Sequence, residues 1–204
     1  MSSELRESFY RGTFTECLAA GRELSTRLDF SKCRRLVDVG GGSGGFSVAM
    51  AEAWPHLEIT VADLPSTAMV AERYINEARL KSRVHLKPTD IVTGKLEGTY
   101  DVAIMRGLIP VLTPEQTRAA LKNVHQALEP GSPLYVVGWI LDDTRSTPLS
   151  YATYNLLFVN DYDNALIHTE AEHRLWLSET GFTDICRNRE SGIYAADYIV
   201  ARRA

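Results

Sequence analysis

A dense cluster of glycines follows a short apolar stretch and limits what this chain can fold into. Leu36–Val39 reads Leu-Val-Asp-Val, and glycines follow at positions 40, 41, 42, 44 and 45. Phe46 to Trp54 then has a helical pattern, which Pro55 ends. A buried strand, a glycine turn and a helix in this order are typical of the first unit of a parallel α/β sheet, in which the start of the helix faces a ligand.

Apolar runs and helical patterns alternate along the rest of the chain, which predicts repeated strand–helix units. We expect further strands at 58–62, 84–87, 101–105, 134–141, near 185 and at 198–201, with helices at about 66–80, 113–129 and 169–181. Residues 4–29 have the pattern of one or two amphipathic helices. We therefore divide the chain into an N-terminal helical segment, 1–33, and a Rossmann-like α/β domain, 34–204.

The glycines predict a ligand with a nucleotide part, but their spacing fits two classes of protein. Gly40, Gly42 and Gly44 fit a G-x-G-x-G pattern, but Gly40, Gly42 and Gly45 also fit the G-x-G-x-x-G fingerprint of dehydrogenases. Asp63 lies 23 positions after Gly40, at the predicted end of the second strand. A carboxylate there can accept hydrogen bonds from ribose hydroxyls in either class. Asp63 also stands before Pro65, so a helix N-cap is the alternative.

Several stretches together resemble one family, the class I S-adenosylmethionine-dependent small-molecule O-methyltransferases of the caffeate, hydroxyindole and bacterial polyketide type. The resemblance covers about residues 9–204. It is carried by residues 36–44, by Asp63-Leu64-Pro65, by Thr89-Asp90-Ile91, by residues 128–137 and by Glu179-Thr180-Gly181-Phe182. It implies a seven-stranded methyltransferase sheet with helices on both faces and with its last strand antiparallel.

The resemblance also implies roles for single residues toward S-adenosylmethionine. Gly40 would contact the amino-acid end of the cofactor, and Asp63 would bind the ribose with Leu64 beside the adenine. Asp90 and Ile91 would hold the adenine ring, a role that separates this reading from a dehydrogenase. Arg106 would face the methionine portion.

Two features depart from the family pattern. Where the family has a histidine that deprotonates the acceptor hydroxyl, this chain has Pro110. His168 is the candidate substitute for that base, since a histidine can accept a proton near neutral pH; a surface histidine is the alternative. The family also carries an N-terminal dimerisation domain that this chain starts too late to contain, so we expect either a homodimer or a missing domain.

A run of aromatic residues in the last third of the chain supplies a candidate acceptor site. Tyr151, Tyr154, Phe158 and Tyr162 follow one another at near-helical spacing. They would form either the wall of an aromatic acceptor pocket or ordinary helix packing.

Composition narrows the remaining choices. A net charge of −4 without a basic cluster disfavours a nucleic-acid partner, and no apolar run is long enough for a membrane span. The three cysteines are spaced unlike a zinc site, so we expect no metal and a cytoplasmic location. The predicted function is methyl transfer to a small molecule, with a hydroxyl oxygen favoured. The alternatives are a cofactor-binding relative without methyl transfer, a partner-dependent non-enzymatic domain and a nicotinamide dehydrogenase.

Overall fold

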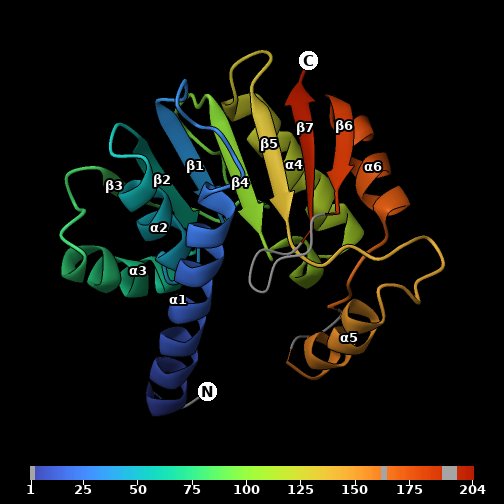
Figure 1. Ribbon diagram of the computed structural model, residues 1–204, viewed down its shortest axis with the longest axis horizontal. Helices are drawn as coiled ribbons and strands as arrows, with labels where there is room; N and C mark the ends of the chain where they lie inside the picture. Colours follow the sequence, from blue (N-terminus) through green and yellow to red (C-terminus); the bar gives the residue numbers. More distant parts are fainter. Residues whose placement is uncertain (1–2, 162–164, 190–196) are drawn as a thin grey trace.

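The computed structural model describes residues 3–161, 165–189 and 197–204, and within them it forms one seven-stranded sheet (Figure 1). The strands are β1 (Arg35–Val39), β2 (Glu58–Asp63), β3 (Val84–Pro88), β4 (Val102–Arg106), β5 (Pro133–Val137), β6 (Phe182–Asn188) and β7 (Tyr198–Arg203). Their order is β3-β2-β1-β4-β5-β7-β6. All neighbours from β3 to β5 pair in parallel, whereas β7 is antiparallel to both β5 and β6. The predicted methyltransferase-type sheet with an antiparallel last strand is confirmed.

The helices follow the predicted patterns closely. They are α1 (Ser3–Ser25), α2 (Gly45–Ala53), α3 (Pro65–Glu77), the short 3-10 helix η1 (Ile109–Val111), α4 (Pro114–Ala127), α5 (Leu149–Asp161) and α6 (Glu170–Glu179). Capping boxes at Thr113 and Thr169 begin α4 and α6, because each threonine hydroxyl accepts from a free backbone N–H of the first turn. None of the described helices is both long enough and apolar enough to cross a membrane.

Each inner strand is apolar on both faces, as a sheet between two helix layers requires. Val37 and Val39 of β1 pack with residues of α4 and α6, whereas Leu36 packs with residues of α1, α2 and α3. The first three helices therefore cover one face of the sheet and α4 and α6 cover the other. The carboxyl ends of the parallel strands share the lower edge in Figure 1, where the start of α1 and all of α5 also lie.

The N-terminal helix packs directly on α2 rather than standing apart from the sheet. Two glycines lie at this crossing: a Cβ on Gly45 would come within 2.4 Å of the Phe14 carbonyl oxygen, and one on Gly21 within 2.6 Å of the Ala49 Cβ. Leu24, at the end of α1, is fully buried in the core on this face. The close approach brings Phe14, Cys17 and Leu18 of α1 against Gly45 at the end of the glycine turn.

This packing predicts a large difference between two glycine substitutions. Gly45→Ala places a methyl group against backbone that has no room to move, so it should lower the free energy of unfolding by about 1–3 kcal/mol. Gly12 lies on the exposed side of the same helix pair with nothing within 4 Å of its Cβ position. Gly12→Ala should therefore raise the free energy of unfolding by about 0.5–1 kcal/mol. Urea denaturation measures both, and equal effects would contradict the close crossing.

Candidate functional site

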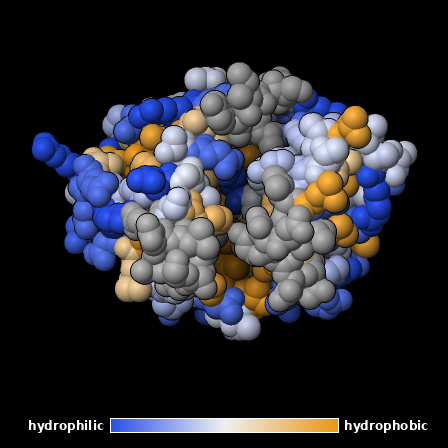
Figure 2. Space-filling view, turned by 90° about the horizontal axis from the view of Figure 1, so that it is seen from below, coloured by the Kyte–Doolittle hydropathy of each residue, from blue (hydrophilic) through white to orange (hydrophobic). Residues whose placement is uncertain are grey.

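A cleft of about 410 Å³ opens at the carboxyl edge of the parallel strands. Figure 2 views the molecule from this edge and shows a central hollow that both hydrophilic and hydrophobic residues border. Its lining comes from α1, from the segments that follow β1, β2, β4 and β5, and from α5. Carboxyl ends of parallel strands are where α/β sheets bind their ligands.

The glycine turn forms the floor of the cleft. Gly40 and Gly42 line it and both have a positive φ, of 71° and 58°. The Cβ position of Gly42 has no atom within 4 Å, so its backbone faces open space. A side chain there would fill the space that a ligand needs to reach the backbone. Gly44 also has a positive φ, but it caps α2 over Ala71 instead of lining the cleft.

Asp63, at the end of β2, is tied to the glycine turn. Its Oδ2 accepts a hydrogen bond of 2.8 Å from the Gly42 N–H, and its Oδ1 accepts one of 2.7 Å from the Leu64 N–H. The residue at the N-cap of α3 is Leu64, so Asp63 does not fill the alternative N-cap position. Burial raises the pKa of the Asp63 carboxyl, although these hydrogen bonds oppose the rise. Asp63 and the half-exposed Leu64 both line the cleft.

Charged side chains gather at the other end of the glycine turn. Arg106, at the end of β4, donates to Glu16 Oε1 at 2.7 Å and to Cys17 Sγ at 3.2 Å, both on α1. Asp38, buried in β1, accepts a hydrogen bond of 2.6 Å from the Ser47 hydroxyl. Arg106, Glu16, Cys17 and Asp38 all line the cleft. A guanidinium between carboxylates suits a ligand end that carries both signs of charge.

The opposite side of the cleft is aromatic. Trp139, which follows β5, stacks on Tyr154 of α5 with ring centroids 4.6 Å apart and also meets Phe158 edge-on. Phe9 and Tyr10 of α1 line the cleft as well. We call Trp139, Tyr154 and Phe158 the aromatic wall. Such a surface can receive a flat apolar molecule beside the charged end.

The remaining predicted residues are divided between the cleft and other parts of the fold. Of the aromatic run, Tyr154 and Phe158 line the cleft, Tyr151 reaches Asp197 instead, and Tyr162 lies outside the described residues. Asp90 closes a local turn, accepting hydrogen bonds from the Val92 N–H and the Thr93 hydroxyl, and Ile91 is buried in the core. Neither is among the residues that line the cleft.

His168, predicted as a substitute base, is buried with 4% of its surface exposed and does not line the cleft. Its ring packs edge-on against Trp176 at 4.7 Å, and its Nδ1 lies 3.7 Å from Glu172 Oε2. Burial lowers its pKa, with Glu172 opposing that shift. The ring therefore lacks access to a ligand. Pro110, at the position of the family's histidine, is buried in η1 and accepts at its carbonyl from the Leu166 N–H.

Sequence reasoning missed several residues that line the cleft, among them Glu16, Cys17 and Trp139. Glu16 and Cys17 reach the cleft only because α1 packs across the glycine turn, and Trp139 does so because β5 ends beside it. The predicted strand over 134–141 hid this residue, because β5 ends at Val137 and Trp139 follows it. Among the described residues no cluster of three histidine, cysteine or carboxylate side chains could hold a metal ion.

Asp38 gives the site a measurable pH signature. Burial is the main cause that raises its pKa to about 6, from 3.8. Because the folded state holds this proton more tightly than the unfolded chain, the stabilisation is present below about pH 4 and is lost as pH rises to about 6. The loss should reach up to ~3 kcal/mol.

The isosteric variant Asp38→Asn removes this titration. Urea denaturation between pH 4 and pH 7.5 should show the wild-type protein losing stability relative to the variant, with the difference constant above pH 6.5. Parallel stability curves for the two proteins would contradict the raised pKa.

Comparison with known proteins identifies the family. The O-methyltransferase domain profile matches residues 1–183. The chain is 31% identical over 174 residues to the tetracenomycin polyketide synthesis 8-O-methyl transferase TcmO of Streptomyces glaucescens, covering 84% of this chain and 50% of TcmO. It is 28% identical over 180 residues to the L-tyrosine C(3)-methyltransferase of Streptomyces lavendulae, covering 88% of this chain and 49% of that protein.

The solved structures agree in fold. The S-adenosylmethionine-dependent methyltransferase SibL, in its apo form, is 32% identical and superimposes with a TM-score of 0.85, covering 99% of this chain and 60% of SibL. The chain thus spans about half the length of the curated relatives it matches. With its matching profile, sheet order and cleft, the chain belongs to the O-methyltransferase domain family, whose cofactor is S-adenosylmethionine.

Proposed function

We propose that this chain binds S-adenosylmethionine and transfers its methyl group to a small-molecule acceptor, with a hydroxyl oxygen favoured. One observation carries the proposal: a single cleft joins a glycine turn, a carboxylate at the end of β2 and a charged end with an aromatic wall. The dehydrogenase alternative rested on the glycine pattern, and the family profile favours methyl transfer instead.

The residues present fit the cofactor. Gly42 would leave room for it over the turn, and Asp63 would accept from its ribose hydroxyls while Leu64 borders the adenine. Arg106 would pair with the carboxylate of the methionine portion, and the carboxylates of Glu16 and Asp38 would attract its ammonium group. The bound cofactor supplies a methyl group on a positively charged sulfur. Asp90 and Ile91 keep the adenine role that the resemblance implies only as a prediction.

The aromatic wall would hold the acceptor and exclude water from the methyl group. Holding two reactants in line is worth up to ~7–11 kcal/mol of the barrier in favourable cases. No histidine, aspartate, glutamate or lysine of the described residues lines the cleft on this side. We therefore propose that the acceptor loses its proton through its own acidity, so an acidic phenol suits the site better than an alcohol.

The ribose assignment predicts a loss of cofactor affinity. Asp63→Asn still accepts from the Gly42 N–H but loses the charge, so S-adenosylhomocysteine should bind ~1–3 kcal/mol more weakly by calorimetric titration. Asp29→Asn is the matched control, since Asp29 is exposed and accepts only from its neighbour Ser31. Equal affinities for the two variants would refute the assignment.

The acceptor assignment predicts a pH dependence that follows the substrate. With 4-nitrophenol, 1-naphthol and 4-methylphenol, which decrease in acidity in that order, kcat/KM should rise with pH around the pKa of each phenol. A side chain acting as base would instead place the midpoint at one pH for all three. A shared midpoint would overturn the proposal of an acceptor that ionises by itself.

The remaining alternatives differ in the same assays. A cofactor-binding relative without methyl transfer would bind S-adenosylhomocysteine and methylate none of the phenols. A partner-dependent domain would show activity only when a further chain is present. A C-methyltransferase among the relatives shows that the acceptor atom varies in this family. A cytoplasmic location is part of the proposal, supported by three unpaired cysteines.

A further inference from the structure

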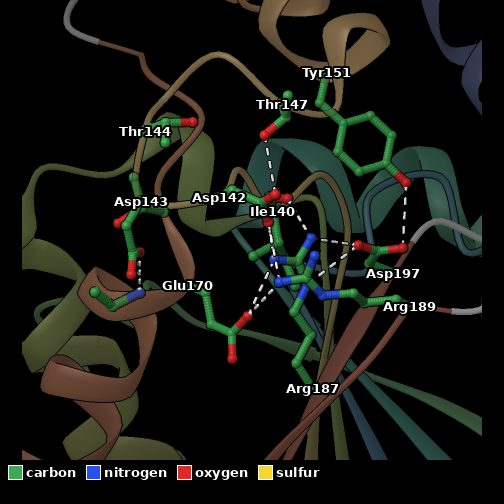
Figure 3. A network of polar contacts seen from close by, with 12 residues as sticks. Ile140, Asp142, Asp143, Thr144, Thr147, Tyr151, Glu170, Arg187, Arg189 and Asp197 are labelled. Carbon is green, nitrogen blue, oxygen red and sulfur yellow. Dashed lines mark hydrogen bonds and ion pairs between the residues drawn. The ribbon is translucent and has the colours of Figure 1, made fainter.

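A buried arginine lies behind the aromatic wall without touching the cleft. Arg187 of β6 has 2% of its side chain exposed and is surrounded by acceptors (Figure 3). Its Nε and Nη2 donate to Asp197 Oδ2 at 3.2 and 2.5 Å, and its Nη1 donates to Asp142 Oδ1 at 3.1 Å and to Glu170 Oε2 at 3.2 Å. We call Asp142, Glu170, Arg187 and Asp197 the Arg187 cluster.

The cluster holds the backbone on both sides of Trp139. Arg187 Nη2 donates to the Ile140 carbonyl at 2.7 Å, and the Gly138 N–H donates to the Asp197 carbonyl at 2.9 Å. Ile140 and Gly138 are the residues directly after and before Trp139. Arg187 and Asp197 therefore fix the peptide from which the indole of the aromatic wall projects.

The Asp197 carboxylate also contacts the helix that carries Tyr154 and Phe158 of the aromatic wall. Tyr151 of α5 donates to Asp197 Oδ1 at 3.5 Å, one turn before Tyr154. Tyr154 is the ring that stacks on Trp139. Asp197 thus contacts the segment that carries Trp139 through its carbonyl and the helix that carries Tyr154 through its carboxylate, while Asp142 and Glu170 also bind Arg187.

A gain in folding stability does not explain this arrangement, because the desolvation cost of a buried ion pair often cancels its attraction. What the pair does provide is direction. A guanidinium offers five N–H donors in a rigid plane. Here they donate to three carboxylates and one backbone carbonyl. A lysine keeps the charge but cannot hold this geometry.

We propose that the pair of Arg187 and Asp197 is a positioning element for the acceptor site: it sets the orientation of Trp139 and thereby which acceptors the cleft accepts. The consequence for acceptors rests on the proposed function. The consequence for Trp139 does not, so the two can fail separately.

Arg189 offers a matched control for Arg187. Its Nη2 lies 3.0 Å from Asp142 Oδ1 and 3.2 Å from Glu170 Oε2, the same two carboxylates, but its contacts include neither Ile140 nor Asp197. Its side chain is 59% exposed. Arg187→Lys and Arg189→Lys each keep one positive charge, and only the first releases the peptide around Trp139.

The direct test is fluorine NMR of protein labelled with 5-fluorotryptophan. The chain has three tryptophans, Trp54, Trp139 and Trp176, and Trp139→Phe identifies the Trp139 signal by its loss. Arg187→Lys should shift or broaden the Trp139 signal and leave the other two unchanged, and Arg189→Lys should change none. An unmoved Trp139 signal, equal changes at all three tryptophans or the same effect from Arg189→Lys would overturn the proposal.

Kinetics test the consequence for the acceptor. With 1-naphthol, Arg187→Lys should raise the acceptor KM about tenfold, as a small displacement of a binding wall does, while the Kd for S-adenosylhomocysteine stays within about twofold. If Arg187→Lys fails to fold, Tyr151→Phe, which removes only the hydroxyl contact with Asp197, should move the Trp139 signal in the same direction by less.

A wild-type protein that methylates no phenol contradicts the proposed function, and the NMR result still decides the positioning role. An unchanged acceptor KM beside a moved Trp139 signal would overturn the claim on acceptor choice.

Discussion

The hydrogen bond from the Gly42 N–H to the Asp63 carboxylate holds the cleft together. It joins the turn after β1 to the end of β2, and it forms only because the turn passes through backbone conformations with positive φ. The open space over Gly42 and the start of α2 both follow from that path. A side chain at position 42, or the loss of the Asp63 carboxylate, would change the floor of the site before it changed the core of the sheet.

The cleft is divided between two kinds of chemistry, and each half depends on an element outside the central strands. The charged half needs α1, since Glu16 reaches Arg106 only because glycines let α1 and α2 approach closely. The aromatic half needs α5 and the segment after β5, which the Arg187 cluster ties to β6 and β7. The parallel strands present the ligand edge, and α1, α5 and the segment after β5 complete the walls.

Much of this could be predicted from residue patterns because the strands, turns and caps are local. Apolar runs placed all seven strands, and the pattern residues Gly40, Gly42 and Asp63 line the cleft whereas Gly44 does not. Leu64 and Arg106, which only the family resemblance indicated, line it as well. Glu16 and Trp139 could not be found that way, since they join the site through helix packing and strand order. His168 shows the opposite error. A histidine beside a capping box looks exposed in the sequence, but Trp176, eight residues later in α6, covers it.

We propose that the cleft at the strand ends is a site for S-adenosylmethionine, with the amino-acid end of that molecule at Arg106 and Glu16. Calorimetric titration with S-adenosylhomocysteine, with 5′-deoxy-5′-methylthioadenosine, which lacks the amino-acid end, and with NAD tests this most directly. We expect one site for S-adenosylhomocysteine, much weaker binding of the truncated nucleoside in the wild-type protein, a smaller difference between these two affinities in Glu16→Gln, and no binding of NAD. Equal affinity for the first two ligands, or binding of NAD in place of S-adenosylhomocysteine, would contradict the proposal.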